Sequence, residues 1–487
     1  MRNDVVIIGA GLGGLECGLT LAKAGMRVVV LEQGGKIGGC IQSYQRHGHT
    51  FDTGFHYVGG LCEGQSLHSA FRMLGLLRLP WVRLDDDADI VSIGDRRFPL
   101  PQGFDNYVCA LSDYFPRQRA GIAKYVEVLR HCSLHQFDAL HGVFNPDELT
   151  EMNACQYLNE TLRDPLLVDV VSGPSLKMEL RRSSLPLFTF AHVSGGYAES
   201  CWRLRGSGQL IADTLARGIR EHGGVVVCRK RVEELVERDG RIVAALCGDG
   251  EEIEGDTFIS DVHPSVTCGM VKNSAKIRHI YRRRMTRLAN TTGMFTVSLV
   301  VKAGVLPYFN NNRYIYPHGD VWGAHEEHAD VSCVMISGRG DGTWTTQVDL
   351  LTPMSIAECA QWTDTVVGHR GEEYKEMKRR KAGECIAIAE RELPGLGGAV
   401  AECHTSTPLT WRDYTLAPDG TAYGIRKDCE DPLSTMLSIK TPLPNLLLTG
   451  QNVMLHGIHG VTMTALFTCA SLLGADYIAR QLSESEA

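Results

Sequence analysis

The chain has 487 residues, of which 44% are hydrophobic and 22% are charged, an ordinary mixture for a globular protein. This composition excludes a disordered or coiled-coil chain, and the length suffices for two or three domains. The formal net charge of −8 gives no general attraction to nucleic acid, so we expect no nucleic-acid partner. Glycine is the outlier, with 52 residues, which indicates many tight turns and close backbone approaches.

Cysteine spacing and the chain start indicate a protein with reduced thiols. The nearest two of the 16 cysteines, Cys385 and Cys403, are 18 residues apart, which excludes Cys-x-x-Cys motifs and zinc ribbons. No charged-then-apolar leader precedes the strand-like run 5–8, so we expect no signal peptide and a cytoplasmic location. The uncharged stretch 441–475 is interrupted by polar and turn-forming residues. The longest helix it predicts, from Gly460 to about residue 475, is shorter than the ~20 residues that a bilayer needs.

The first 32 residues predict one compact βαβ unit. Residues 4–8 are rich in β-branched side chains and suit a parallel strand buried on both faces. A glycine-rich turn follows, then apolar residues at helical spacing over residues 12–22. A second apolar strand, 27–31, ends at Glu32.

The turn has the spacing Gly9-x-Gly11-x-x-Gly14, with Glu32 eighteen residues beyond Gly14. The glycines serve the tight turn, the close approach of the backbone to a pyrophosphate, and the packing of helix on strand. Amides at the helix start, around Leu12 and Gly13, can hold phosphates, and Glu32 can accept both ribose hydroxyls. The pattern therefore predicts a dinucleotide site.

A second glycine-rich turn follows Glu32 directly. It runs from Gln33 to Gly38, Gly39 and Cys40, and it resembles the extended FAD fingerprint of the amine oxidase/phytoene desaturase superfamily. A surface hairpin is the alternative. The next loop, 51–60, resembles the one found in retinol saturases (all-trans-retinol 13,14-reductases) and carotenoid isomerases.

The C-terminal region resembles the last flavin contact of the same superfamily. Residues 445–449 predict a strand that leads into a Gly450-Gln451 turn. The resemblance implies that the following helix start points at the flavin, where its partial positive charge stabilises the reduced anion; the residues there are Gly460, Val461 and Thr462. It also implies a backbone contact of Val232 with the adenine, although the adjacent basic residues 229–231 could simply be solvated.

The remaining segments predict an α/β fold with two interleaved parts. Helices are expected at 106–114, 122–134, 146–162, 371–392 and in a segment ending near 222, and strands at 225–228, 231–238, 242–247 and 257–261. Alternation at 293–302, 313–316, 331–337 and 344–351 predicts a separate, largely antiparallel sheet. We expect a Rossmann-type FAD-binding domain from 1–65, 200–290 and 402–487. An α+β substrate-binding domain should comprise 66–199 and 291–401.

Reduction of a C=C bond needs a hydride from flavin N5 and a proton donor within reach of the second carbon. His56 and Tyr57 are the first candidates for the catalytic donor by their motif position, and His456 and His459 follow. Each histidine could instead only bind backbone or carbonyl oxygen. We expect no metal: His456-x-x-His459 has a glycine between its histidines and no carboxylate or cysteine close by.

No second GxGxxG occurs in a strand–turn–helix context, which indicates that a separate NAD(P)H domain is lacking. NAD(P)H would have to reduce the flavin at the substrate face, or another redox protein would supply the electrons. The apolar runs 185–190 and 294–297 could line a lipophilic tunnel or could be ordinary core. An open tunnel mouth would bring peripheral contact with a membrane.

The resemblance implies an FAD-dependent oxidoreductase that saturates a C=C bond of a hydrophobic polyene or terpenoid substrate. A redox-neutral carotenoid cis/trans isomerase and a desaturase are alternatives on the same scaffold. A third alternative is a non-catalytic lipid carrier of the GTPase dissociation-inhibitor type, but a carrier has little reason to keep the glycine turns, Glu32 and the Gly450-Gln451 turn. The substrate's identity, the direction of the chemistry, the physiological electron donor or acceptor, the proton donor and the oligomeric state stay open.

Overall fold

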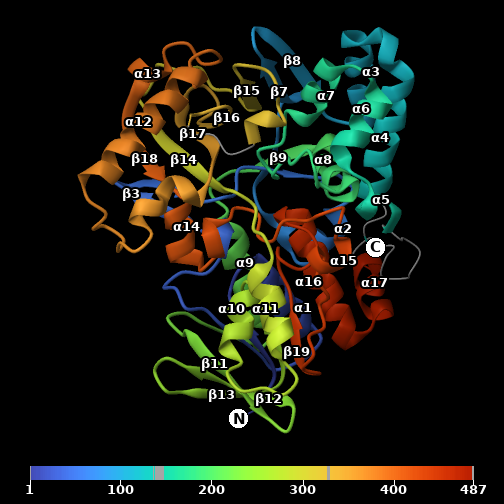
Figure 1. Ribbon diagram of the computed structural model, residues 1–487, viewed down its shortest axis with the longest axis vertical. Coiled ribbons are helices and arrows are strands. Elements are labelled where there is room, and N and C mark those ends of the chain that lie inside the picture. The colour runs from blue at the N-terminus through green and yellow to red at the C-terminus, as the bar shows by residue number, and fades with distance from the viewer. Residues whose placement is uncertain (1, 135–136, 138–146, 326–329, 485–487) are drawn as a thin grey trace.

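The structure is a computed structural model that describes residues 2–134, 137, 147–325 and 330–484. Two seven-stranded sheets form its framework. Figure 1 shows the sheet of the N-terminal strand in the lower half and the other sheet in the upper half, with helices around both.

The lower sheet has the strand order β10-β2-β1-β13-β12-β11, with β19 beside β13. Its five parallel strands are β1 (Asn3–Ile8), β2 (Val28–Leu31), β10 (Val225–Val227), β13 (Glu252–Ser260) and β19 (Leu446–Leu448). Helix α1 (Leu12–Lys23) joins β1 to β2, so the predicted βαβ unit is confirmed. α1 also packs closely on α9 (Gln209–Glu221), where a Cβ at Gly18 would lie 2.8 Å from Ile219 Cδ1.

An antiparallel extension completes this sheet. β11 (Val232–Arg238), β12 (Arg241–Cys247) and β13 form the predicted meander. The strand expected at 225–228 is not part of the meander. It is β10, which pairs in parallel with β2 at the edge of the sheet.

The upper sheet has the order β18-β14-β17-β16-β15-β7-β8, and only its β15–β7 pair is parallel. Its strands are β7 (Asp87–Ile93), β8 (Arg96–Pro101), β14 (Gly293–Val301), β15 (Asn312–Tyr316), β16 (Val334–Gly340), β17 (Thr345–Met354) and β18 (Val400–Ser406). The largely antiparallel sheet is thus confirmed. β7 and β8 come from a region for which only helices and loops were expected. β18 crosses the expected boundary at 402, and the domain division stays a prediction.

Smaller elements join the sheets. β3 (Ser43–Arg46) and β4 (His49–Asp52) form a hairpin, and β5 (Val58–Gly59), β9 (Cys201–Leu204) and β6 (Trp81–Arg83) form a three-stranded sheet. Arg203 of β9 is buried and binds the upper sheet: it donates to Gly338 O at 2.7 Å and to Asn312 Oδ1 at 2.9 Å.

Helices cover both sheets. They include α2 (His68–Met73), α3 (Phe104–Tyr114), α4 (Arg119–Leu134), α7 (Pro165–Ser172), α8 (Leu187–Glu199), α10 (Pro264–Met270), α11 (His279–Arg287), α12 (Glu372–Ala389), α13 (Leu396–Ala399), α14 (Pro408–Thr415), α15 (Pro432–Thr435), α16 (Gly457–Leu473) and α17 (Ala475–Glu484). The single helix expected at 146–162 is wrong. α5 (Asp147–Glu151) and α6 (Ala154–Leu162) replace it, because Asn153 is extended and its side chain caps α6 by accepting from Gln156 N. Pro146 lies outside the described residues.

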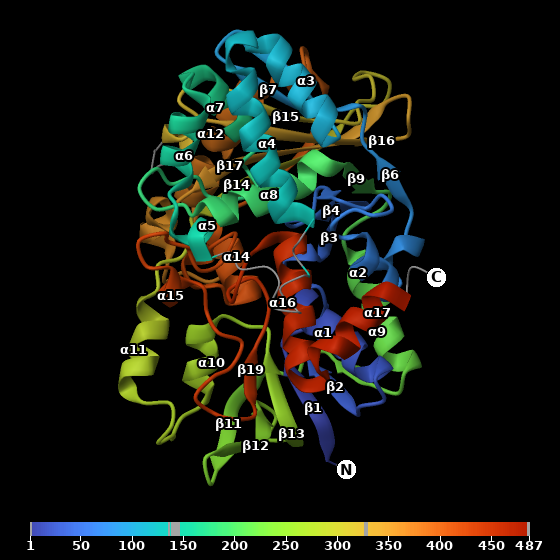
Figure 2. The ribbon, with the colours of Figure 1, turned by 90° about the vertical axis from the view of Figure 1, so that its right-hand side faces the viewer.

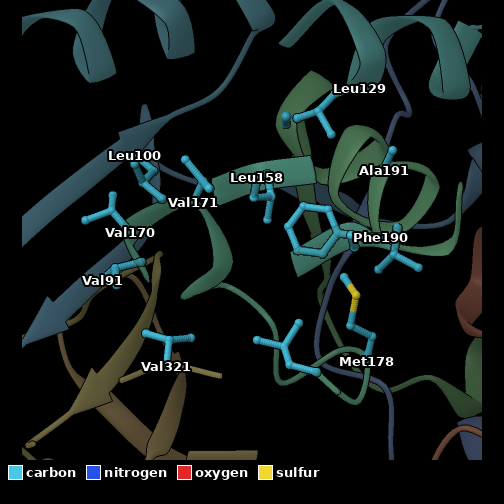
Figure 3. Packing of buried hydrophobic residues seen from close by; sticks show 14 of the residues in the cluster. Val91, Leu100, Leu129, Leu158, Val170, Val171, Met178, Phe190, Ala191 and Val321 are labelled. Atoms are coloured by element: carbon cyan, nitrogen blue, oxygen red, sulfur yellow. The ribbon is translucent and has the colours of Figure 1, made fainter. Parts of the chain in front are cut away.

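The largest hydrophobic core lies between the helices of the upper half and β7. Figure 3 shows Leu129, Leu158 and Phe190 converging there. The apolar run 185–190 belongs to this core, so of its two interpretations the ordinary core is the one observed. No helix in the described ranges has the length and apolarity needed to cross a bilayer.

Candidate active site

A cavity of about 890 Å³ extends from the glycine turns to the upper sheet. Its volume is in the upper range of small-molecule sites. The predicted residues that line it are Gly9, Gly11, Leu12, Gly13, Glu32, Gln33, Gly38, Gly39, Cys40, His56, Tyr57, Val232, Gln451 and Val461. Among the described residues, its lining does not include Gly14, Gly450, Gly460, Thr462, His456 or His459.

One wall of the cavity is made of backbone from three distant segments. Gly38 N donates to Ala10 O at 2.8 Å, and a Cβ at Gly39 would lie 3.2 Å from Gly11 Cα. On the other side, a Cβ at Gly13 would lie 3.0 Å from Gly450 Cα. The second glycine turn is therefore part of the cavity wall and not a separate surface hairpin. A side chain at Gly13 or Gly39 would therefore collide with neighbouring backbone and push these segments apart.

Glu32 connects the two N-terminal glycine turns. Its Oε2 accepts from Ala10 N at 3.0 Å and its Oε1 from Gly34 N at 2.7 Å. The carboxylate lies at the end of β2 and lines the cavity, so it is available to ribose hydroxyls from the predicted position.

Asp261 is a site residue that the sequence reasoning missed. It follows β13 directly, and its carboxyl lies against the first glycine turn and accepts from the amides of Gly11 and Gly14. Burial raises the pKa of this carboxyl to about 7. The signal was its place at the carboxyl end of a predicted strand, since neighbouring parallel strands end at one edge of a sheet.

The C-terminal contact is shifted along the chain. α16 begins at Gly457 and not at Gly460, and Gly457, Ile458 and Val461 face the cavity. Thr462 instead donates to Glu16 Oε1 at 2.8 Å, which fixes α16 on α1. The start of α16 thus faces the cavity as expected, but through an earlier turn.

His56 faces the cavity as a buried, neutral side chain. Its Nδ1 is 3.8 Å from Asp349 Oδ2, and no ring nitrogen of His56 has a hydrogen-bond partner in the described part of the chain. Burial, reinforced by Arg339, lowers its pKa to about 4. An imidazole with two open nitrogens in a cavity wall is suited to bind a ligand.

Tyr57 belongs to a buried cluster that we call the Tyr57 cluster: Tyr57, Asp89, Lys177, Tyr197 and Tyr314. The Tyr57 hydroxyl is 2.6 Å from that of Tyr314, and Lys177 Nζ donates to it at 3.0 Å. Lys177 Nζ is also 3.6 Å from Asp89 Oδ2 and 3.9 Å from the Tyr197 ring centre. Burial raises the pKa of Tyr57 well above 10 and lowers that of Lys177. Lys177 and Tyr197 also line the cavity, and nothing in their local sequence singled them out.

The two C-terminal histidines lie behind the cavity wall. His456 is the residue before α16 and packs against the Tyr423 ring, with ring centres 5.0 Å apart. His459 Nε2 is 3.0 Å from Ser66 Oγ, in a network with Glu199. Burial lowers the pKa of both histidines to about 3.

These features fit a flavin dinucleotide. The glycine turns pack too closely for side chains at Gly13 or Gly39 and line the cavity with backbone, the Glu32 carboxylate lies beside them, and the starts of α1 and α16 line the same cavity.

Comparison with known proteins agrees with this geometry. The sequence profile described as "Flavin containing amine oxidoreductase" matches residues 12–473. The all-trans-retinol 13,14-reductase of Rattus norvegicus is 25% identical, with 97% of this chain and 86% of the rat protein covered. The chloroplastic prolycopene isomerase 2 of an Oncidium hybrid cultivar is also 25% identical, over 86% of this chain and 75% of the relative. A putrescine oxidase structure with bound putrescine superposes with a TM-score of 0.65 at 16% identity, covering 97% of this chain and 99% of that one.

Proposed function

This chain belongs to the flavin-containing amine oxidoreductases, and from that premise we propose that it saturates a C=C bond of a hydrophobic polyene or terpenoid. One observation carries the proposal: a single cavity joins a dinucleotide cradle to an apolar compartment with a buried proton-bearing cluster. The likeness to retinol 13,14-reductases over nearly the whole chain supports it.

The FAD would be held at three places along the cavity. The first glycine turn would hold the pyrophosphate, Glu32 the ribose, and the start of α16 the flavin end. Bound FAD supplies the hydride for such a reduction. The chain's own residues must then bind the substrate, exclude water and supply a proton.

The substrate compartment is largely apolar, with the Tyr57 cluster and His56 among the polar groups in its wall. Met294, Met335, Leu351 and Trp411 line it, and Lys177 is its one side chain that carries a charge among the described lining residues beyond the dinucleotide cradle. Such a lining binds an extended hydrocarbon and leaves water few partners. This composition supports a hydrophobic substrate.

We assign the proton to Tyr57. Its phenol stays protonated at every working pH because burial raises its pKa, and the Lys177 ammonium 3.0 Å away stabilises the phenolate as the proton leaves. Lys177 also approaches Asp89, so the pair can return a proton to the phenolate.

His56 takes a different part in this proposal. With its pKa lowered to about 4, it is a neutral imidazole at pH 7 and a poor acid. Its open nitrogens would orient a polar group of the substrate or the flavin.

Substitution separates the two roles. A Tyr57→Phe variant, which lacks the proton, should lose about 10² to 10⁴ in the rate of reduction. His56→Gln should lose less in rate and more in substrate affinity.

Flavin content separates this proposal from a lipid carrier. Purified protein, denatured and analysed by mass spectrometry, should release one FAD per chain. A chain that binds polyene but never FAD would be a carrier. Product mass separates the two enzymatic alternatives: saturation adds two hydrogen atoms, whereas isomerisation leaves the mass unchanged.

The reductant stays part of the proposal. We infer that NAD(P)H at the open cavity or another redox protein reduces the flavin, since the sequence contains one dinucleotide fingerprint. Anaerobic mixing with NADPH and NADH tests the first route, and an unreduced flavin would direct the search to a protein donor.

A further inference from the structure

Helix α11 (His279–Arg287) presents an unusual outer stripe to solvent. Ile280, Arg283, Arg284 and Arg287 follow the spacing i, i+3, i+4, i+7 and are all exposed, with Ile280 at 75%. On the inner side of the helix, Met285 is buried in a hydrophobic cluster.

The helix is fixed in place from that inner side. The Arg282 guanidinium donates to the main-chain carbonyls of Cys268 and Val271, at the end of α10. Tyr281 packs against two hydrophobic clusters. The stripe is therefore held outward on a rigid base.

Positive charge is concentrated around this stripe. Residues 272–287 contain seven Lys and Arg and no Asp or Glu, in a chain whose net charge is −8. We call the exposed set the α11 face: Lys276, Arg278, Ile280, Arg283, Arg284 and Arg287. Arg278, Arg283 and Arg287 have no ion-pair partner among the described residues.

The border of the face is also defined. Arg284 donates to Leu433 O at 2.9 Å, which brings the 88% exposed Leu433 beside the stripe. Glu430 and Asp431 are exposed next to Leu433 and limit the positive region on that side. Ile280, surrounded by arginines along the helix, is thus the apolar anchor of the face.

The face adjoins the cavity. Val266, Gly269 and Met270 of α10 line the cavity wall. Figure 2 shows α11 at the outer flank of the molecule with α10 on its inner side. A surface bound to α11 would therefore lie one helix away from the cavity.

We propose that the α11 face docks on an anionic lipid bilayer. Unpaired arginines are attracted to the negative headgroups, and a protruding isoleucine can enter the interface between headgroups and acyl chains. Nucleic acid would use the charges but would leave Ile280 in water, so the lipid surface fits both features. The binding itself does not depend on the proposed function. Only its use does, because an apolar polyene substrate accumulates in a bilayer.

Vesicle co-sedimentation tests the docking with the FAD-loaded protein. Wild type should bind phosphatidylcholine vesicles containing phosphatidylserine, bind pure phosphatidylcholine much more weakly, and dissociate at high salt. Each basic residue near such a surface contributes about fivefold in affinity, so R283Q/R284Q/R287Q should lose about a hundredfold. Ile280→Ser should lose about tenfold at constant charge.

A matched variant on α12 controls for charge alone. K375Q/R379Q/R380Q removes the same number of charges, from side chains that are already paired with glutamates of their own helix. It should bind vesicles within about threefold of wild type. No binding by wild type, or equal losses in both triple variants, overturns the docking. Tighter binding of an oligonucleotide than of anionic vesicles does the same.

The docking and the proposed function can fail separately. Turnover of a detergent-solubilised polyene should be unchanged in R283Q/R284Q/R287Q, because these residues do not line the cavity in the described structure. Vesicle binding without polyene turnover in wild type would leave the docking standing and overturn only the reaction.

Discussion

The two oxygens of Glu32 should be worth about tenfold to a hundredfold in FAD affinity. Each oxygen accepts from one backbone amide, Oε2 from Ala10 and Oε1 from Gly34. Glu32→Gln keeps the shape but removes the negative charge, so a ribose hydroxyl that would donate to the carboxylate loses a charged acceptor. A hydrogen bond to a charged group contributes about 1.5–3 kcal/mol, and each 1.4 kcal/mol is tenfold in Kd.

Titration of flavin-free protein with FAD and with FMN measures this effect. FMN lacks the adenosine ribose, so Glu32→Gln should weaken FAD binding and change FMN binding much less. Glu233→Gln is the matched control, because Glu233 lines the same cavity, is exposed, and makes no hydrogen bond to either glycine turn within the described ranges. Equal losses for FAD and FMN would refute a ribose contact and indicate a general loss of the turn structure. Unchanged FAD binding would refute the reasoning altogether.

Three further changes test the packing around the site. Asp261→Asn should gain at least about 1 kcal/mol in free energy of unfolding relative to wild type as the pH rises from 5 to 8, measured by urea unfolding. The folded-state pKa of about 7 exceeds the ordinary 3.8, so wild type loses stability as the pH rises through the folded-state pKa. A difference in free energy between the two proteins that stays constant with pH would contradict this. Gly59→Ala should lower the melting temperature strongly, because the alanine Cβ would lie 2.1 Å from a backbone carbonyl oxygen of α8. Gly383→Ala, at an open position within helix α12, should leave the melting temperature unchanged or raise it. Arg203→Met should cost about 1–3 kcal/mol for each buried acceptor that it leaves unpaired, such as Gly338 O and Asn312 Oδ1, whereas Arg205→Met on the exposed neighbour should cost little. Similar costs for the two variants would refute the bridging role of Arg203.

The dinucleotide cradle could be predicted because its signals are local. The β-branched run of β1, the glycine spacing and the acid at the end of β2 lie within 32 residues. Each of these residue types is required by the local backbone: a buried strand, a tight turn and the end of a strand. The second glycine turn could also be predicted, because its backbone needs positive φ values, 117° at Gly38 and 53° at Gly39, which glycine adopts most readily.

The chemistry of the substrate compartment could not be read in the same way. Tyr57 came from a motif, but its partners Lys177 and Tyr314 stand 120 and 257 residues away, in segments without a recognisable pattern. For His456 and His459 the difficulty was local, because their positions relative to the cavity depend on where α16 begins. One shift of a helix start, from residue 460 to Gly457, decides which side chains of that turn face the cavity.

Strand β7 was missed for a physical reason as well. Its residues are buried from Ala88 to Ile93, so no alternation of polar and apolar side chains marks it as a strand. Its pairing with β15, more than 200 residues later, supplies the structure that local sequence does not indicate.

An anaerobic single-turnover experiment shows whether this protein reduces a C=C bond. The protein's flavin is reduced chemically, all-trans-retinol or a carotenoid is added, and flavin reoxidation is followed together with the mass of the recovered polyene. We predict one oxidised flavin for each polyene that gains two hydrogen atoms, with Tyr57→Phe at least about a hundredfold slower. A polyene isomerised at unchanged mass over a flavin that stays reduced would contradict the reductase and establish the isomerase in its place.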